Sequence, residues 1–477
     1  MPPTQSTSKF PVGWTYALAA VASFMVSLDN LVVTTALPQI RLHLHSGVQG
    51  LEWIVNAYTL TFAVLLLTGA ALGDRFGRRR ILTIGLAVFT VSSMAAALAP
   101  SIGFLVAART LQGVGGAMIL PLTLTIVANA APVERRGAIL GVYGAVGGLA
   151  VAFGPLVGGL VTELASWQWI FWINVPIGVV TLALIGRIAE SWGPAQRLDL
   201  PGLGLVSSGL FATVYALVRT DTYSWGSPQV VVPLGAGAAL LAAFVAHERR
   251  TPQPMLPLRL FANRSFSASN IASLLFSFGM FGSIFLLAQF LQTVQHFSPL
   301  GAGLRTLPWT AMPMFVAPIA GPLSDRIGGR PLMVTGLAMQ AAGLAWLATL
   351  LRPTATFADL VAPFVLCGIG MSLFFVPVSQ MVLGSVGPLE QGVASGANNA
   401  VREFGGVLGI AVLASVFASR GSYATGAAFV AGTRPAVAVG ALIVGLGAVA
   451  AAFTHRRGTG GVMVEAPVLD SPELTTA

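Results

Sequence analysis

The chain has 477 residues, of which 55% are hydrophobic and only 9% are charged, whereas about a quarter of the residues of a soluble domain carry charge. This balance predicts a protein that lies in a lipid bilayer, with little length left for a separate soluble domain. The only lysine, Lys9, follows a serine, which excludes an ATP-binding Gly-Lys phosphate loop, and the only cysteine, Cys367, excludes an intrachain disulfide and a thiolate metal site.

Fourteen apolar stretches, bounded by glycine, proline or charged residues, follow one another along the chain. Each is long enough to approach the roughly 20 residues that a transmembrane helix needs. Trp225, Gly226 and Pro228 favour a turn between the seventh and eighth stretches over one long helix. The predicted spans are 14–37, 52–72, 81–99, 103–127, 137–161, 167–187, 201–219, 229–246, 267–292, 305–322, 332–351, 357–381, 393–418 and 434–453.

The basic residues predict the orientation of these spans. Most of the 25 lysine and arginine residues fall in loops and tails on the side of the two termini, and basic residues accumulate on the cytoplasmic side of membrane proteins. We therefore expect both termini in the cytoplasm and the chain in the bacterial cell membrane. Because topology accounts for the net charge of +9, that charge does not indicate a nucleic-acid partner.

Two similar loop motifs indicate an internal repeat. Both fall on the predicted cytoplasmic side, as parallel repeats require. In each, the aspartate can accept hydrogen bonds from the positive N-terminal end of a neighbouring helix. The glycine allows a tight turn, and the arginines can pair with carboxylates or lipid phosphates. A single copy would be explained by the charge distribution alone, whereas two matched copies predict a pair of gating loops. Their residues are Asp74, Arg75, Gly77 and Arg78 after the second span, and Asp325, Arg326 and Gly328 after the tenth.

The repeat predicts a division into two bundles. Six spans in each half leave two between them. The expected organisation is a cytoplasmic tail over 1–13, a six-helix bundle over 14–190, two linking transmembrane helices over 191–250, a second six-helix bundle over 251–453 and a disordered cytoplasmic tail over 454–477.

Four charged residues fall deep inside predicted spans, away from the span ends: Asp29, Arg109, Arg402 and Glu403. A charge at mid-bilayer costs about 2.5–3.5 kcal/mol on insertion scales, so each requires a reason. Asp29 is predicted to accept a proton or to attract a cationic substrate; a helix-packing carboxylate is the alternative. Arg109 either holds a carboxylate ionised or forms a structural salt bridge. Arg402 and Glu403 point about 100° apart on a helix, so they need not pair with each other, and Glu403 is either a second titrating site or a polar packing residue.

The fifth span carries a spaced set of small residues. Gly154, Pro155, Gly158 and Gly159 predict a bend and a smooth face that allows close helix approach. Isolated glycine and proline are common in membrane helices, but the full spaced set favours a functional role.

These motifs together resemble those of the major facilitator superfamily, in particular its fourteen-span drug:proton antiporter branch. The loop motif is similar to that of the superfamily, with Ala70 where glycine usually begins it. Arg109 stands in the fourth-span motif, and Asp29 stands in the first-span signature. Gly141, Gly154, Pro155, Gly158 and Gly159 match the fifth-span motif associated with exporters, in which Ala150 replaces a glycine.

The resemblance implies a fold class and a function. The fold is an all-α integral membrane protein with two six-helix bundles and two linking helices. The implied function is proton-coupled export of lipophilic drugs or antibiotics, cationic ones among them. The resemblance implies no enzyme activity, no cofactor and no metal, with the proton gradient as energy source, and we expect a monomer. The alternatives are a proton-coupled uptake symporter and a non-transporting membrane sensor.

Overall fold

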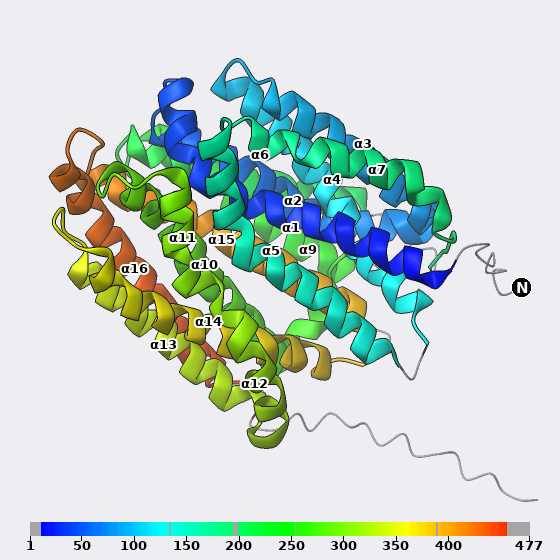
Figure 1. Ribbon diagram of the computed structural model, residues 1–477. Coiled ribbons are helices and arrows are strands. Elements are labelled where there is room, and N and C mark those ends of the chain that lie inside the picture. The colour runs from blue at the N-terminus through cyan, green and yellow to red at the C-terminus, as the bar shows by residue number, and fades with distance from the viewer. Residues whose placement is uncertain (1–10, 133–134, 194–198, 253, 388–389, 456–477) are drawn as a thin grey trace, which may run out of the picture.

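The computed structural model describes residues 11–132, 135–193, 199–252, 254–387 and 390–455 (Figure 1). The tails expected over 1–13 and 454–477 therefore lie mostly outside the described residues. The regular elements within the described ranges are helical. The first half contains α1 Val12–His43, α2 Val48–Phe76, α3 Arg78–Ala97, α4 Ile102–Ala130, α5 Arg136–Leu164, α6 Trp169–Trp172 and α7 Asn174–Leu184, followed by the 3-10 turn η2 Ile185–Arg187.

The remaining helices form a linking pair and a second half. The linking pair is α8 Leu200–Val218 and α9 Pro228–Arg250, with the short turns η3 Arg219–Asp221 and η4 Leu258–Ala262. The second half contains α10 Arg264–Thr293, α11 Pro299–Thr310, α12 Met312–Ile327, α13 Gly329–Leu350, α14 Phe357–Gly384, α15 Gln391–Arg420 and α16 Gly426–Ala451.

Polar residues at the loops begin several of these apolar helices. The first backbone N–H groups of a helix lack a partner within it, and a side-chain oxygen just before the helix accepts their hydrogen bonds. Asp199 accepts from Gly202 at the start of α8 at 2.9 Å. Asn263 caps α10 in the same way, and Thr356 with Asp359 forms a reciprocal capping box at α14.

Twelve helices among the described residues are long and apolar enough to cross a membrane, whereas the sequence predicts fourteen. Each predicted stretch overlaps helical structure, but two fall short of a continuous apolar span. In α5 the apolar part found is Ala152–Leu164. The tenth stretch is divided at Ala311 into α11 and α12, and α12 contains Pro318 and Pro322, whose missing N–H groups interrupt helical hydrogen bonding. The exact count of fourteen stays a prediction.

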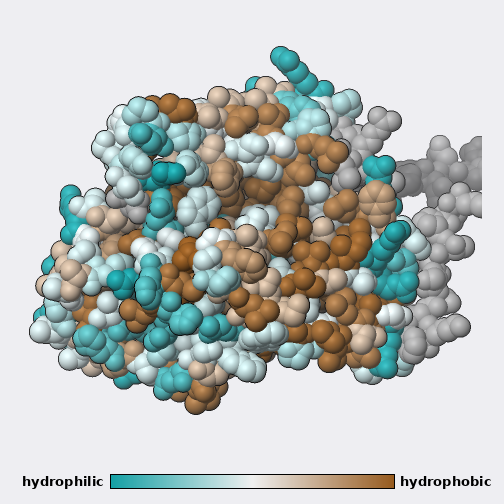
Figure 2. All heavy atoms as spheres, turned by 90° about the horizontal axis from the view of Figure 1, so that it is seen from above, coloured by the Kyte–Doolittle hydropathy of each residue, from teal (hydrophilic) through white to brown (hydrophobic). Residues whose placement is uncertain are grey.

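The two halves lie side by side (Figure 1). The pair α2 and α15 packs across their boundary, as does the pair α5 and α11, while α8 packs against both α2 and α15 and α9 packs against α8. Figure 2 shows hydrophobic side chains gathered across the middle of one face and more hydrophilic ones toward its ends. This distribution suits a molecule whose middle lies in lipid.

One end of the bundle, here called the termini face, holds the start of α1 and the end of α16 (Figure 1). The other end is called the opposite face. Near the opposite face, Gln292 Nε2 of α10 donates to the Thr35 carbonyl of α1 at 2.8 Å. The helix α1 continues past the predicted end at residue 37, which brings the Arg41 guanidinium to 3.9 Å from the centre of the Tyr423 ring. The halves are therefore joined across the opposite face.

Candidate functional site

A buried ion pair joins α1 to α4 inside the first half. Arg109 Nη1 donates to Asp29 Oδ2, and the side chains are 0% and 1% exposed for Arg109 and Asp29. Gln112 Nε2 donates to Asp29 Oδ1 at 2.9 Å, and Asn174 Nδ2 donates to the same oxygen at 2.7 Å. The structure thus brings together two of the predicted charges, which stand 80 residues apart in the chain.

Arg109 has further partners around its guanidinium. Its Nε donates to the carbonyl of Ile54 at 3.2 Å, and its Nη1 donates to Gln112 Oε1 at 2.8 Å. The Tyr58 ring centre lies 4.2 Å from the guanidinium carbon, close enough for a cation–π interaction. A buried ion pair is tolerated when additional hydrogen bonds satisfy its remaining polar atoms. The network does this for both Asp29 oxygens and for Arg109 Nε and Nη1, whereas Arg109 Nη2 has no hydrogen-bond partner among the described residues.

Sequence reasoning missed Gln112, Asn174 and Ser93, which complete this network. Gln112 Nε2 also donates to Ser93 Oγ at 2.7 Å. Each is an uncharged polar residue in an apolar span, and such residues are common in membrane helices. The available signal was the position of Gln112 three residues after Arg109, because residues i and i+3 share a helix face.

The second pair of charges lies in α15, in the other half. Arg402 Nη2 lies 3.4 Å from Glu403 Oε1. The two residues therefore pair although their Cα–Cβ directions diverge, because the arginine side chain is long enough to reach back. Glu403 is 6% exposed, and its Oε2 atom has no hydrogen-bond partner among the described residues. The Arg402 guanidinium lies 5.4 Å from the centre of the Phe375 ring.

Tyr58 contacts one of the charged groups and lies within electrostatic range of the other. Its ring contacts the Arg109 guanidinium, and its hydroxyl is within electrostatic reach of the Glu403 carboxylate. Tyr58 belongs to α2, which packs against α15 across the boundary between the halves. The acidic side chains Asp29 and Glu403 therefore belong to different halves and approach the same aromatic residue.

The first gating loop makes its contacts within the first half. Asp74 Oδ1 accepts from Arg78 Nε at 2.8 Å and from Nη2 at 2.7 Å. The sequence places an aspartate at a neighbouring helix N-terminus, but Glu190 takes that role: it accepts from the backbone N–H groups of Arg79 and Arg80 at 2.8 and 3.2 Å. Gly77 has φ of 102°, which glycine adopts without strain.

The second gating loop repeats the backbone of the first but has fewer contacts. Gly328 has φ of 87°, matching Gly77. Asp325 Oδ1 accepts from Gln380 Nε2 of α14 at 3.4 Å. The Arg75 guanidinium lies 5.2 Å from the centre of the Phe76 ring, and Arg326 lies exposed. The contacts described for Asp74 and Asp325 stay within the respective halves and do not bridge them.

The small residues of α5 lie between α1 and α11. A Cβ on Gly154 would stand 2.6 Å from Leu31 Cβ, and one on Gly158 would stand 2.5 Å from the Val32 carbonyl oxygen, both in α1. Gly159 faces the backbone of Pro299 in α11. The motif therefore allows α5 to approach a helix of each half closely. Pro155 lies within α5. Gly141 lies nearer the start of α5, and its surroundings lie outside the part of the chain that the structure describes.

We expect Gly158→Leu to reduce transport strongly. The branched side chain cannot fit against the α1 backbone, so α5 must move away from α1. The matched control is Gly147→Leu in the same helix, because a Cβ there has nothing within 4 Å. Uptake and efflux by proteoliposomes of equal protein content measure the effect. Equal transport by the two leucine variants would show that close packing of α5 is unimportant.

The chain was compared with known proteins. A family model described as Major Facilitator Superfamily matches residues 19–410 and residues 270–463. The cephamycin export protein CmcT of Amycolatopsis lactamdurans is 38% identical over 425 residues, covering 87% of each chain. The tetracenomycin C resistance and export protein of Streptomyces glaucescens is 33% identical over 412 residues, covering 85% of this chain and 76% of that protein.

Solved structures share the fold at low sequence identity. A bacterial homologue of the human lysosomal transporter Spinster, in an inward-facing and unoccupied conformation, matches with a TM-score of 0.66 at 15% identity and covers 93% of this chain and 97% of its own. The xylose transporter XylE from E. coli, in a partially occluded inward-open conformation, matches with a TM-score of 0.60 at 16% identity, covering 92% and 96%.

Proposed function

Because the chain belongs to the Major Facilitator Superfamily, a family of membrane transporters, we propose that it exports lipophilic drugs or antibiotics in exchange for protons. The observation that carries the proposal is the Asp29–Arg109 pair, buried and hydrogen-bonded in the first half. The relatives named as export and resistance proteins favour outward movement of the substrate. The proton gradient supplies the energy, no cofactor is required, and the transporting unit is a monomer.

The coupling step follows from the cost of separating buried charges. Removing one partner of a buried ion pair leaves an uncompensated charge and costs about 3–5 kcal/mol. While Asp29 is ionised, Arg109 is therefore held in place. Protonation of Asp29 removes the charge that opposes Arg109 and leaves Asp29 able to donate a hydrogen bond, so Arg109 is free to change partners. Tyr58, on which the guanidinium rests, transmits that change toward the second half.

Glu403 is the proposed counter-charge for a cationic substrate. Asp29 is enclosed by Arg109, Gln112 and Asn174, so in this conformation it does not offer a free oxygen to a substrate. Glu403 Oε2, in contrast, lacks a hydrogen-bond partner among the described residues. Phe375 lies beside the neighbouring Arg402, and Tyr58 is within electrostatic range of Glu403. A carboxylate together with aromatic surface suits a lipophilic cation.

The way the halves meet supports a side from which substrate enters in this conformation. They are joined near the opposite face through Gln292 with Thr35 and Arg41 with Tyr423. With both termini in the cytoplasm, this conformation loads substrate from the cytoplasm or the inner leaflet. The loops of Asp74 and Asp325 then act as gates on the cytoplasmic side, where their contacts rearrange when that side closes.

Transport in proteoliposomes tests the proposal. A pH gradient is imposed, with the acidic solution on the side of the membrane opposite the cytoplasmic face of the protein. This gradient is expected to drive transport of a lipophilic cation such as ethidium without ATP. An ionophore that dissipates the gradient is expected to stop it. Movement of substrate in the same direction as protons would identify the uptake symporter instead, and absence of any movement across a panel of lipophilic compounds would favour a sensor.

A further inference from the structure

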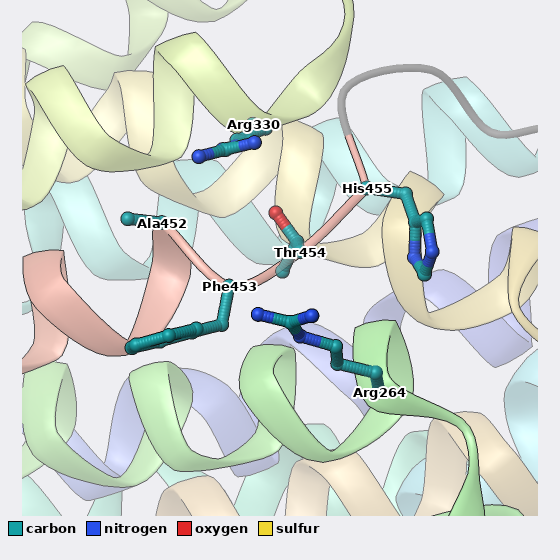
Figure 3. A pocket seen from close by; sticks show the side chains of 6 residues that line it. All are labelled: Arg264, Arg330, Ala452, Phe453, Thr454 and His455. Atoms are coloured by element: carbon teal, nitrogen blue, oxygen red, sulfur yellow. The ribbon is translucent and has the colours of Figure 1, made fainter.

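A small pocket opens on the termini face, at the ends of helices of the second half. Its volume is about 200 Å³, and it is lined by Arg264, Arg330 and the segment Ala452–His455. Figure 3 shows the two arginine side chains on either side of Thr454. Arg264 begins α10, Arg330 lies in the first turn of α13, and the segment follows the end of α16. Three helices far apart in the chain therefore meet at this pocket.

The pocket carries positive charge that the described residues do not neutralise. Neither Arg264 nor Arg330 has a carboxylate within ion-pair distance among them, unlike Arg259, which pairs with Glu390 on the same face. The Arg264 guanidinium lies 5.2 Å from the centre of the Phe453 ring. Two guanidinium groups converging on one cavity form a site for phosphate, which accepts several hydrogen bonds from arginine.

The start of α13 adds to the attraction for an anion. Gly328 precedes α13 and provides no side-chain cap, whereas Asn263 caps α10. The uncapped N–H groups of a helix N-terminus carry partial positive charge and favour an anion. This feature reinforces the two arginines but would not define a site without them.

An apolar stripe leads from the pocket along α16. Leu442, Leu446 and Val449 of α16 are 64%, 49% and 57% exposed, and their spacing of four and three places them on one side of the helix. Phe453, just beyond the end of α16, is 53% exposed. In a membrane this side faces lipid. A phospholipid fits the pocket and the stripe together better than inorganic phosphate does. Its acyl chain would cover the stripe, whereas inorganic phosphate would leave the stripe uncovered.

We propose that the pocket binds the phosphate of an anionic glycerophospholipid, with an acyl chain along the stripe of α16. Arg264 and Arg330 hold the phosphate from two sides, and the chain lies on Leu442, Leu446, Val449 and Phe453. The bound lipid links the ends of α10, α13 and α16. Arg330, the last arginine of the second loop motif, thereby acquires a role distinct from that of Asp325.

Lipid binding to the purified full-length chain tests this site. Native mass spectrometry in neutral detergent measures the apparent Kd for phosphatidylglycerol, phosphatidylcholine and inorganic phosphate. Phosphatidylglycerol is expected to bind most tightly. Arg264→Gln and Arg330→Gln are each expected to weaken it about fivefold, the contribution typical of one basic residue at an anionic surface. Arg330→Lys, which keeps the charge, is expected to lose less.

Arg250→Gln is the matched control, because Arg250 is exposed at the end of α9 on the same face and lies outside the pocket. It is expected to bind phosphatidylglycerol like the unaltered chain. Unchanged binding in the double variant of Arg264 and Arg330 would overturn the proposal. Inorganic phosphate binding as tightly as the lipid would overturn the part assigned to the acyl chain. These binding measurements do not depend on transport, so their failure would leave the proposed export function standing.

Discussion

Asp29→Asn is expected to reduce proton-driven transport of every substrate to background. Asparagine keeps the size of the side chain but cannot take up a proton, so the step that frees Arg109 is lost. The substitution also leaves Arg109, which is fully buried, without its counter-charge. A buried unpaired charge costs about 3–5 kcal/mol, so a lower Tm is expected as well. Substrate-induced proton release in detergent and pH-driven transport in proteoliposomes measure the two functional effects.

A second variant separates lost coupling from lost folding. Asp29→Asn combined with Arg109→Gln removes both charges and is expected to recover much of the Tm while transport stays absent. Asp29→Glu keeps a titratable carboxyl and is expected to retain part of the activity. Proton release that survives Asp29→Asn but disappears in Glu403→Gln would contradict the assignment and make Glu403 the coupling site.

Glu403→Gln is expected to weaken binding of cationic substrates at least about tenfold, a change of roughly 1.4 kcal/mol, and to spare neutral ones. The carboxylate is buried, and one of its oxygens has no partner among the described residues, so a bound cation would gain an attraction that water screens poorly. Binding of a cationic compound and of a neutral compound of similar size, measured by fluorescence or calorimetry, provides the comparison.

Glu390→Gln provides the matched control for that experiment. Glu390 immediately precedes α15, the helix that contains Glu403, but it lies at the termini face in an ion pair with Arg259. The control makes the same change in charge away from the proposed site, so it is expected to leave both affinities unchanged. An equal loss of affinity for cationic and neutral compounds in Glu403→Gln would argue for a packing role instead.

Asp29 and Glu403 have different hydrogen-bond partners, which explains how one transporter could use two buried acids for different steps. Asp29 is held by three donors within the first half, an arrangement that responds to a proton. Among the described residues, Glu403 in the second half is held only by its neighbour Arg402 at 3.4 Å, an arrangement that leaves one carboxylate oxygen for a ligand. Tyr58 lies within electrostatic range of both acids, so a change of charge at either acid alters the environment of the same ring.

The sequence by itself determined the membrane location, the approximate positions of the helices and the family. These follow from local quantities: the length of apolar runs, the residues that bound them, and short motifs read along the chain. The same local reasoning identified Asp29, Arg109, Arg402 and Glu403 as unusual, because the cost of a charge in lipid depends on its surroundings being apolar. It also identified the turns at Gly77 and Gly328, which both have positive φ.

Only the tertiary structure decided which of these residues meet. Asp29 and Arg109 are brought together by the packing of α1 against α4, and Asn174 joins them from α7. Glu190, rather than Asp74, occupies the start of α3 because the segment after α7 folds back over that helix end. Helical periodicity predicts the face of a helix but not the partner that covers it, and apolar helices offer many partners of similar hydrophobicity. Contacts between residues distant in sequence therefore depend on how helices pack, which no single stretch of the chain encodes.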